Sequence, residues 1–267
     1  MRIAEALKRA VVFCIQPKRW LPFFIIDLTF LSVALALVLS NVTSLLYLVS
    51  GITDISIIGP AAAVFFGLLA LLIGWGLVNV WITGALIHQS HKEKEFRESW
   101  AVSFSRYLSL LGVTAIAGLI AFVVSLVQYV GWLFAIFTGL VFFFSMQGVI
   151  VRRSGFMEAI EDSVNIFSKN PFRVFAAWLL ILGISLILLG IFALPLLALI
   201  FSILIEAAAG GIVNTATVIN AVFAIQSQLP MLVITGIIAL VGLAISRAFS
   251  IKAQTEFYLQ FRKAKAR

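Results

Sequence analysis

Six stretches of this chain run for about twenty residues each with at most one charged side chain, which is roughly the length a helix needs to cross a membrane. Within the hydrocarbon layer only helices and closed barrels satisfy every backbone hydrogen-bonding group. The chain is 63% hydrophobic and 11% charged, whereas soluble domains are about 45–50% apolar and about 25% charged. We therefore predict an all-α integral membrane protein with six transmembrane helices. The predicted spans are 20–40, 60–87, 107–127, 131–151, 172–194 and 230–248.

The basic residues are consistent with six spans. All 19 lysines and arginines then fall on one side of the membrane, in or beside the N-terminal segment, the second and fourth connections, and the C-terminal end. Basic residues near span ends are retained in the cytoplasm, so both termini are predicted to be cytoplasmic. The net charge of +8 then reflects topology and attraction to anionic lipid headgroups, and nucleic acid is not an expected partner.

Two connections on the opposite side leave an alternative open. Residues 41–59 and 205–229 are long, apolar and free of lysine and arginine. Within the second, residues 219–228 (INAVFAIQSQ) fit a segment lying flat on the membrane surface or a re-entrant one. Pro195 is predicted to end or kink the fifth helix. An eight-span arrangement, with extra hairpins in both connections, also keeps the two termini on one side.

A short amphipathic segment precedes the fifth span. In GFMEAIEDSVNIFS, Phe156, Ile160, Val164 and Phe167 recur at helical spacing, with acidic residues on the other face, and KNPFRVF follows. RIAEALKRAVVFC before QPKRWLPFF repeats this plan, and KEFRESWAVSF before the third span repeats it more weakly. We therefore predict three transmembrane hairpins, each preceded by a cytoplasmic interfacial amphipathic helix.

Arginine and proline stand where each short helix meets its span. Proline suits the first turn of the spanning helix, where its missing N–H loses no partner. Arginine can extend to lipid phosphate while its stem stays in the apolar layer. The expected interface anchors are Arg19, Arg106 and Arg173.

The threefold plan predicts an internal repeat within one membrane domain, residues 1–267. The repeat units are approximately 1–90, 91–153 and 154–253, followed by a basic cytoplasmic tail at 254–267. Because the copies share one orientation, they would be parallel repeats, related by an axis near the membrane normal.

EAIEDSVNIFSKNPFRVFAAWLLILGI and the closing TEFYLQFRKAKAR carry a resemblance to a known family. They resemble the six-span membrane domain attached to some bacterial glycerophosphodiester phosphodiesterases and its stand-alone bacterial and archaeal relatives. The resemblance implies a module of the prokaryotic plasma membrane. The catalytic barrel of those phosphodiesterases has no counterpart in these 267 residues, so their chemistry is not carried over.

Ionisable residues inside the predicted spans are the strongest site candidates. Asp27 and Arg247 reach similar depths from opposite chain directions, about 10 Å and about 7–8 Å below the same interface. A charge at mid-membrane costs roughly 2.5–3.5 kcal/mol on insertion scales and tends to find a partner. We therefore expect the two to pair inside the bundle, with Asn79 and Gln147 in the same polar layer. This layer is interpreted as a structural clamp or, alternatively, as a path for a solute or proton.

Small residues on the last span favour the clamp. Gly242, Ser246 and Ser250 recur at intervals of four residues, which suits close helix packing.

Other chemistry-bearing residues have simpler interpretations. His88 and His91 supply two metal ligands at most, where a site needs three or four, so a solvated helix end is expected. Cys14 is expected to be a packing residue, with palmitoylation as the alternative. Asn41 begins a glycosylation sequon on the predicted outer side. No metal site, cofactor or catalytic residue is predicted.

These patterns favour a non-catalytic membrane module. Its expected partners are anionic lipid headgroups or a protein, bound through a cytoplasmic collar made by the three short helices and the basic tail. The alternative is a small-solute permease that uses the polar layer around Asp27.

Overall fold

A computed structural model describes residues 3–44, 55–93, 95–208 and 227–265. Every regular element in these ranges is a helix, as predicted. Six helices are long and apolar enough to cross a membrane, in agreement with the predicted number. These six segments are Pro17–Ser40, Gly59–His91, Tyr107–Ser125, Gly131–Val151, Pro171–Ile205 and Leu229–Lys263.

Ten helices follow one another along the described chain. They are α1 (Ile3–Cys14), α2 (Pro17–Ser40), α4 (Ile55–His91), α5 (Phe96–Ser105), α6 (Tyr107–Ser125), α7 (Gly131–Val141), α8 (Ser145–Val151), α9 (Phe156–Lys169), α10 (Pro171–Ala208) and α12 (Leu229–Lys265).

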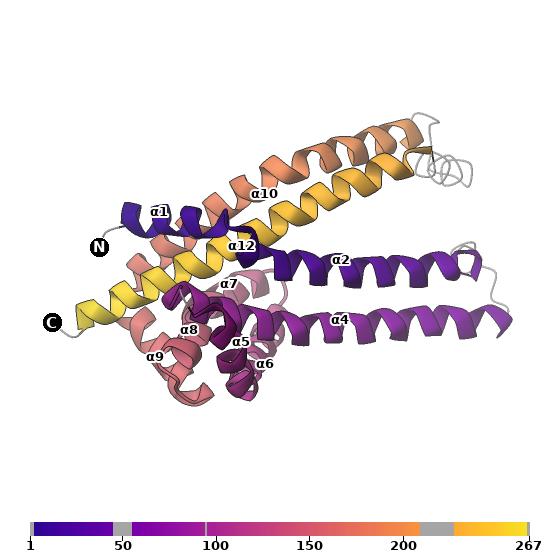
Figure 1. Cartoon of the computed structure of the whole chain (residues 1–267). Coiled ribbons are helices and arrows are strands. Elements are labelled where there is room, and N and C mark those ends of the chain that lie inside the picture. Colours follow the sequence, from indigo (N-terminus) through magenta and orange to yellow (C-terminus); the bar gives the residue numbers. More distant parts are fainter. Residues whose placement is uncertain (1–2, 45–54, 94, 209–226, 266–267) are drawn as a thin grey trace.

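Four long helices form two arms that diverge (Figure 1). One arm is α2 with α4, and the other is α10 with α12; the two helices of each arm contact one another. The arms meet where α12 contacts both α2 and α4. The shorter helices α1 and α5 to α9 cluster around that meeting region and the nearby ends of the long helices (Figure 1).

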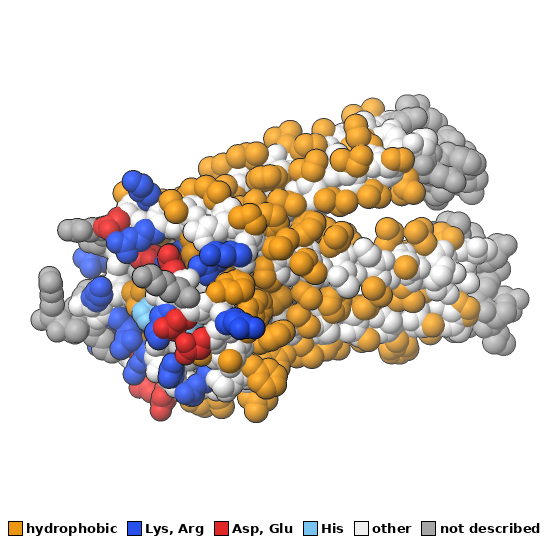
Figure 2. Space-filling view, in the orientation of Figure 1, with side chains coloured by type: hydrophobic (Ala, Val, Ile, Leu, Met, Phe, Trp, Pro, Cys, Tyr) orange, Lys and Arg blue, Asp and Glu red, His pale blue; other side chains and the backbone are white. Residues whose placement is uncertain are grey.

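The side chains divide the molecule into a charged end and apolar arms (Figure 2). We call the end that carries α1, α9 and the last turns of α12 the charged end, because lysine, arginine, aspartate and glutamate gather there. The buried core also lies toward this end, where Phe13, Ile87, Phe144 and Phe257 are at most 2% exposed. In the arms, large apolar side chains such as Leu72, Ile187 and Ile234 are exposed, as expected where lipid is the solvent.

Prolines mark the starts of two spans as predicted. α2 begins at Pro17 and α10 begins at Pro171, directly after Asn170 closes α9. The α5–α6 junction has no proline; there the chain turns at Arg106, whose φ of −108° and ψ of 9° are not helical. One or two residues thus separate each of α1, α5 and α9 from the long helix that follows it.

Two helix ends differ from the prediction. α10 continues through Pro195 to Ala208, so of the two predicted effects of this proline, an end or a kink, the end is wrong. Residues 254–265 belong to α12 and are not a separate tail: Phe257 and Tyr258 are fully buried among the short helices, which stabilises the continuous helix.

The fourth span is two helices, α7 and α8, separated at Phe142–Phe144. Ser163 of α9 compensates the break: its hydroxyl donates to the Val141 carbonyl (2.7 Å) and accepts from the Phe144 N–H (3.1 Å). Such a break needs a polar partner because backbone groups inside a membrane must be satisfied within the protein.

Most of the two long connections lies outside the described residues. Residues 45–54 and 209–226 fall there, and with them the extra hairpins of the eight-span alternative and most of the segment expected to lie flat or to re-enter.

Candidate functional site

Asp27 and Arg247 lie in contact between the two arms. Nη1 of Arg247 on α12 donates to Oδ2 (2.8 Å) and Oδ1 (3.0 Å) of Asp27 on α2. Two residues of α4 complete the cluster: Trp75 Nε1 donates to Asp27 Oδ1 (2.8 Å), and Asn79 Oδ1 accepts from Arg247 Nη1 (3.3 Å). The structure therefore brings together three of the four predicted polar residues, and it adds Trp75.

The cluster is closed on the Asp27 side. The side chain of Asp27 is 4% exposed and that of Arg247 is 26% exposed. The rings of Phe23 and Trp75 lie 5.9 Å and 5.4 Å from the guanidinium carbon of Arg247. A nearly buried carboxylate that accepts three hydrogen bonds from two other helices is suited to holding those helices together.

Gln147 does not join this cluster, contrary to expectation. Its Nε2 donates to Oε1 of Gln254 (3.0 Å), seven residues beyond Arg247 on α12. Seven residues of helix are about 10 Å, so Gln147 contacts α12 about two turns closer to the charged end. The break between α7 and α8 sets where Gln147 meets α12, and hydropathy did not reveal this break.

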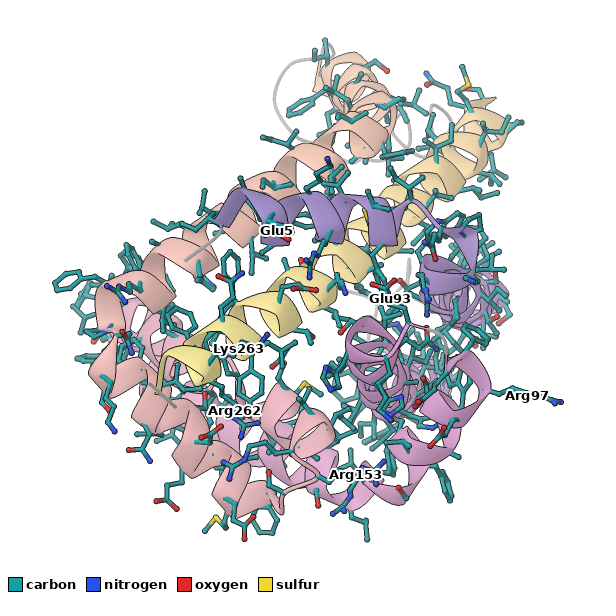
Figure 3. All side chains as sticks on the ribbon, turned by 60° about the vertical axis from the view of Figure 1, so that its left-hand side comes forward. Glu5, Glu93, Arg97, Arg153, Arg262 and Lys263 are labelled. Atoms are coloured by element: carbon teal, nitrogen blue, oxygen red, sulfur yellow. The ribbon has the colours of Figure 1, made fainter. Side chains whose placement is uncertain are left out.

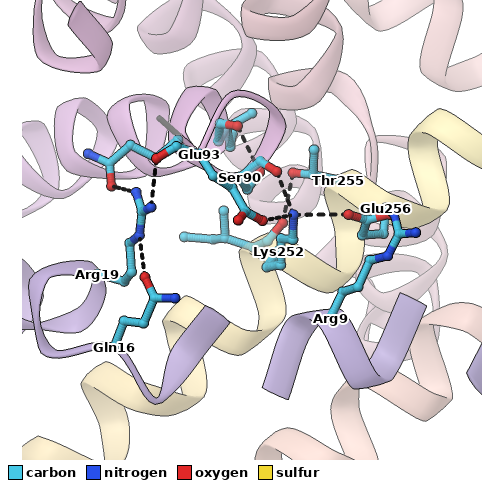
Figure 4. Close-up of polar contacts among 11 residues, drawn as sticks. Arg9, Gln16, Arg19, Ser90, Glu93, Lys252, Thr255 and Glu256 are labelled. Atoms are coloured by element: carbon cyan, nitrogen blue, oxygen red, sulfur yellow. Dashed lines mark hydrogen bonds and ion pairs between the residues drawn. The ribbon is translucent and has the colours of Figure 1, made fainter. Parts of the chain in front are cut away.

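Arg19 is buried inside the protein, so its predicted role as a lipid anchor is wrong. It is 2% exposed. Its Nη1 donates to Gln89 Oε1 (2.9 Å), its Nη2 to the Glu93 carbonyl (2.9 Å), and its Nε to Gln16 Oε1 (3.4 Å) (Figure 4). The ring of Phe13 lies 4.8 Å from the guanidinium carbon. The guanidinium therefore joins the start of α2 to the end of α4.

The other two predicted anchors are placed differently. Arg106 is half-buried at the junction of α5 and α6, and Arg173 is exposed in the first turn of α10. The three arginines occupy matching positions in the sequence plan but have unlike surroundings.

Lys252 on α12 is a second buried cation at the charged end, with an acceptor for each of its N–H groups. Its side chain is 3% exposed. Its Nζ donates to the Ser90 carbonyl (2.6 Å) and lies 2.9 Å from both Glu93 Oε1 and Glu256 Oε1 (Figure 4). Three acceptors match the three N–H donors of an ammonium group, which offsets the cost of its burial.

An alternating row of charges continues outward from Lys252. Glu256 Oε2 lies 3.7 Å from Arg9 Nη1, and Arg9 Nη2 lies 2.6 Å from Glu5 Oε1 on the same helix. The hydrogen bond from Lys252 lowers the pKa of Glu93, outweighing the opposite effect of its partial burial. The row therefore links α1, α12 and the end of α4 by charged contacts at neutral pH.

A cleft of about 1650 Å³ opens beside this row at the charged end. α1, residues 90–93 with Glu95, Arg173 in the first turn of α10, and the last turns of α12 line it. In Figure 3, Glu5, Glu93 and Lys263 lie around this region, while Arg97 points away from it. Its charged and histidine lining residues are Glu5, Lys8, Arg9, His91, Lys92, Glu93, Glu95, Arg173, Lys252, Glu256 and Lys263.

His88 is buried, so the prediction that both histidines lie at a solvated helix end is wrong for this residue. His88 is 3% exposed, and its Nδ1 lies 2.9 Å from Ser99 Oγ of α5. His91 is exposed. Among the described residues no group of three or more histidine, cysteine, aspartate or glutamate side chains is arranged to hold a metal ion.

Cys14 lies where a packing residue is expected. It is 1% exposed, its thiol donates to the Val11 carbonyl (3.2 Å), and burial raises its pKa to about 11. The thiol is therefore covered and protonated at neutral pH, which disfavours acylation of the folded protein.

The small-residue face of α12 packs on α10. Ser246 Oγ donates to the Ser185 carbonyl (3.0 Å), and Ser250 Oγ lies 2.7 Å from Ser185 Oγ. A Cβ atom added at Gly242 would overlap the side chain of Phe192. This arm is therefore held by close contact between small residues and hydroxyl groups.

Sequence reasoning did not identify Lys252, Glu256 and Glu93 as a cluster. The i,i+4 spacing of Lys252 and Glu256 on one helix face was the available local signal. No local sequence pattern indicates that Glu93 belongs to this cluster, because it lies 159 residues before Lys252.

Comparison of the chain with descriptions of protein families, with curated proteins and with solved structures finds no match.

Proposed function

We propose that this protein is a non-catalytic membrane module that binds an acidic segment of a protein partner in the cleft at its charged end. The observation that carries the proposal is the charge distribution in that cleft. Each of its four glutamates forms an ion pair with a cation of the protein itself. Glu5 pairs with Arg9, Glu95 with Lys92, and both Glu93 and Glu256 with Lys252. Three exposed cations of the lining, Lys8, Arg173 and Lys263, have no ion pair within the described chain.

This arrangement leaves excess positive charge around a concave surface. The paired residues hold the floor rigid, and the three unpaired cations can accept an anionic ligand without breaking existing pairs. Electrostatic complementarity of this kind raises association rates and selects partners by charge. Apolar side chains in the same lining, including Val12 and Leu259, give an amphipathic peptide further contact area.

The length of the cleft favours a protein segment over a lipid headgroup. Its lining follows α12 from Lys252 to Lys263, and eleven residues of helix extend about 16 Å. A headgroup layer is only about 5–8 Å thick on each side of the hydrocarbon. A ligand that fills the cleft therefore has to extend into water.

The proposal includes the predicted orientation. With the charged end in the cytoplasm, the lysines and arginines follow the positive-inside tendency, and the plasma membrane of a prokaryote is the proposed location. The short helices α1, α5 and α9 would then form an interfacial collar before three hairpins. Two observations support this. Each of these short helices precedes a pair of long apolar helices that contact one another. In Figure 3, α1 lies across the view while α2 is seen nearly end-on, so the two helices run in different directions.

The same order supports a parallel threefold repeat, although the middle copy is shorter and its second span is broken. The resemblance to the membrane domain of glycerophosphodiester phosphodiesterases stays a prediction that fits a non-catalytic module.

The permease alternative has less support. A solute path needs polar groups that water can reach, whereas the Asp27 carboxylate is 4% exposed and bonded to Arg247 and Trp75. The clamp interpretation accounts for these contacts directly.

A peptide-binding measurement tests the proposal. The protein is placed in nanodiscs of zwitterionic lipid, and a fluorescent peptide rich in aspartate and glutamate is titrated by anisotropy. We expect saturable binding that weakens with salt. Lys8→Gln/Arg173→Gln/Lys263→Gln should abolish it, while the matched variant Arg97→Gln/Arg153→Gln/Lys169→Gln, which removes the same charge from exposed positions outside the lining, should retain it.

Lipid is tested in the same preparation. If the peptide does not bind, but nanodiscs containing anionic lipid show enrichment of that lipid that the cleft variant loses, the ligand is lipid and the protein-partner proposal fails. Equal effects of the two triple variants would also overturn it, because binding would then reflect only net charge.

A further inference from the structure

A second, apolar groove lies between the two arms, away from the charged cleft. Its volume is about 450 Å³, within the roughly 300–1,000 Å³ of typical small-ligand sites. Three helices line it: α2 with Leu31 and Ala34, α4 with Leu68 and Leu72, and α12 with Leu240 and Leu243.

The groove has one polar end and one apolar end. On each helix the lining runs over about seven residues: from Asp27 to Ala34 on α2, from Trp75 back to Leu68 on α4, and from Arg247 back to Leu240 on α12. Seven residues of helix are about 10 Å. The ion pair and Trp75 thus close the end nearer the charged end, and leucines line the rest.

Arg247 has hydrogen-bonding capacity left at this polar end. Only its Nη1 bonds to Asp27 and Asn79; Nε and Nη2 have no hydrogen-bond partner in the described part of the chain, and the side chain is 26% exposed. Unpaired guanidinium donors in an apolar setting are costly unless a ligand or water accepts from them.

The surroundings indicate what fills the groove. The arms consist of helices that are apolar enough to span a membrane, and Figure 2 shows an open wedge between them that narrows toward the charged end. A ligand that enters from the hydrocarbon layer and offers acceptors at one end of a long apolar chain matches both ends of the groove.

We infer that the groove is a binding site for one phospholipid molecule. One acyl chain lies along Leu31, Leu68 and Leu240, and the ester or phosphate oxygens at its polar end accept from Nε and Nη2 of Arg247. The bound lipid fills the space where the arms diverge and is retained when bulk lipid is removed.

Native mass spectrometry of the purified protein, loaded with a single defined phospholipid and then delipidated in detergent, tests the inference. We expect one phospholipid to stay bound to the wild type. Ala34→Trp fills the groove and should lower the occupancy by more than about tenfold. Ala36→Trp, an equal change at an exposed position on the same helix outside the lining, should leave it unchanged.

A second pair of variants guards against a folding defect. Leu240→Trp narrows the groove from α12, and Ile238→Trp is its exposed control outside the lining. Thermal unfolding identifies which variants are folded. Arg247→Lys keeps a cation beside Asp27 but removes the two unpaired donors, so it should also retain less lipid.

The inference is overturned if the wild type keeps no phospholipid, or if folded groove-filling variants keep as much as their controls. A retained mass that matches a second copy of the chain or an apolar molecule without phosphate would overturn it as well. Unchanged retention in Arg247→Lys would refute the polar contact assigned to Arg247.

Discussion

The guanidinium of Arg247 lies 2.8 Å from the carboxylate of Asp27 across 220 residues of sequence. This contact joins α2 of one arm to α12 of the other at the point where the arms meet. Because Trp75 and Asn79 of α4 bond to the same pair, three of the six spans depend on it. Apolar contacts alone hold membrane helices weakly, since lipid solvates leucine as well as a neighbouring helix does.

Removing either partner of this pair should destabilise the bundle. A fully buried partner left alone costs roughly 3–5 kcal/mol, and the partial exposure of Arg247 should reduce that cost. We expect Asp27→Asn and Arg247→Gln each to lower the midpoint of thermal unfolding in detergent. The double variant should recover part of the loss, with a coupling of roughly 0.5–3 kcal/mol. Strictly additive losses would show that the contact does not stabilise the fold.

The substitution Lys252→Met should make the charged end unfold more easily. It deletes the cation that faces Glu93, Glu256 and the Ser90 carbonyl, leaving acceptors without a donor. Breaking a fully buried pair costs roughly 3–5 kcal/mol, and the 54% exposure of the Glu93 side chain should reduce the loss below that range. Lys263→Met is the control, an exposed lysine on the same helix. A denaturant titration in detergent gives the unfolding midpoint of each variant. Similar midpoints for the two variants would contradict the central role of Lys252.

Glu93 should make stability fall in acid. Its pKa is below the ordinary value of 4.5 because Lys252 bonds to its carboxylate. A lowered folded-state pKa means that this stabilisation is complete above about pH 4.5 and is lost as the pH falls through the lower value. Between about pH 6 and about pH 3, Glu93→Gln should therefore lose less thermal stability than the wild type. Glu161→Gln, an exposed acid on α9, should follow the wild type; equal acid sensitivity in all three proteins would exclude this contribution.

Cys14 should resist modification while the protein is folded. The thiol is 1% exposed and its pKa is raised to about 11, so neither access nor thiolate favours reaction. We expect no maleimide labelling at neutral pH until the protein is denatured. Ile15→Cys in a Cys14→Ser background is the control, because Ile15 is 66% exposed and its replacement should label at once. Rapid labelling of folded wild type would refute the burial of Cys14.

Gly242→Ala should loosen the arm formed by α10 and α12. The added methyl group meets the side chain of Phe192, and overpacking typically costs about 1–3 kcal/mol. Gly236→Ala on the same helix meets no atom within 4 Å, so it should be neutral or stabilise by up to about 1 kcal/mol through helix propensity. Thermal unfolding of the two variants tests this difference in sign.

The charged end shows how local prediction fails. Arg19 and Arg173 are each the third residue of a helix that begins with proline, yet Arg19 is buried and Arg173 is exposed. The difference arises because the end of α4 supplies Gln89 and the Glu93 carbonyl to Arg19. Such a partner is set by helix crossing, which a sequence motif does not encode.

The sequence by itself determined the number of helices long and apolar enough to span a membrane, the all-helical class and the approximate positions of α1, α5 and α9. It did so because the thickness of the bilayer and the absence of water within it permit few alternatives to an apolar helix of about twenty residues. Only the tertiary structure decided that Lys252 meets Glu93, that Gln147 pairs with Gln254 instead of joining Asp27, and that α12 continues to Lys265 inside the core. These contacts depend on the distances between helices far apart in the chain, whereas apolar periodicity reports only the environment along each helix.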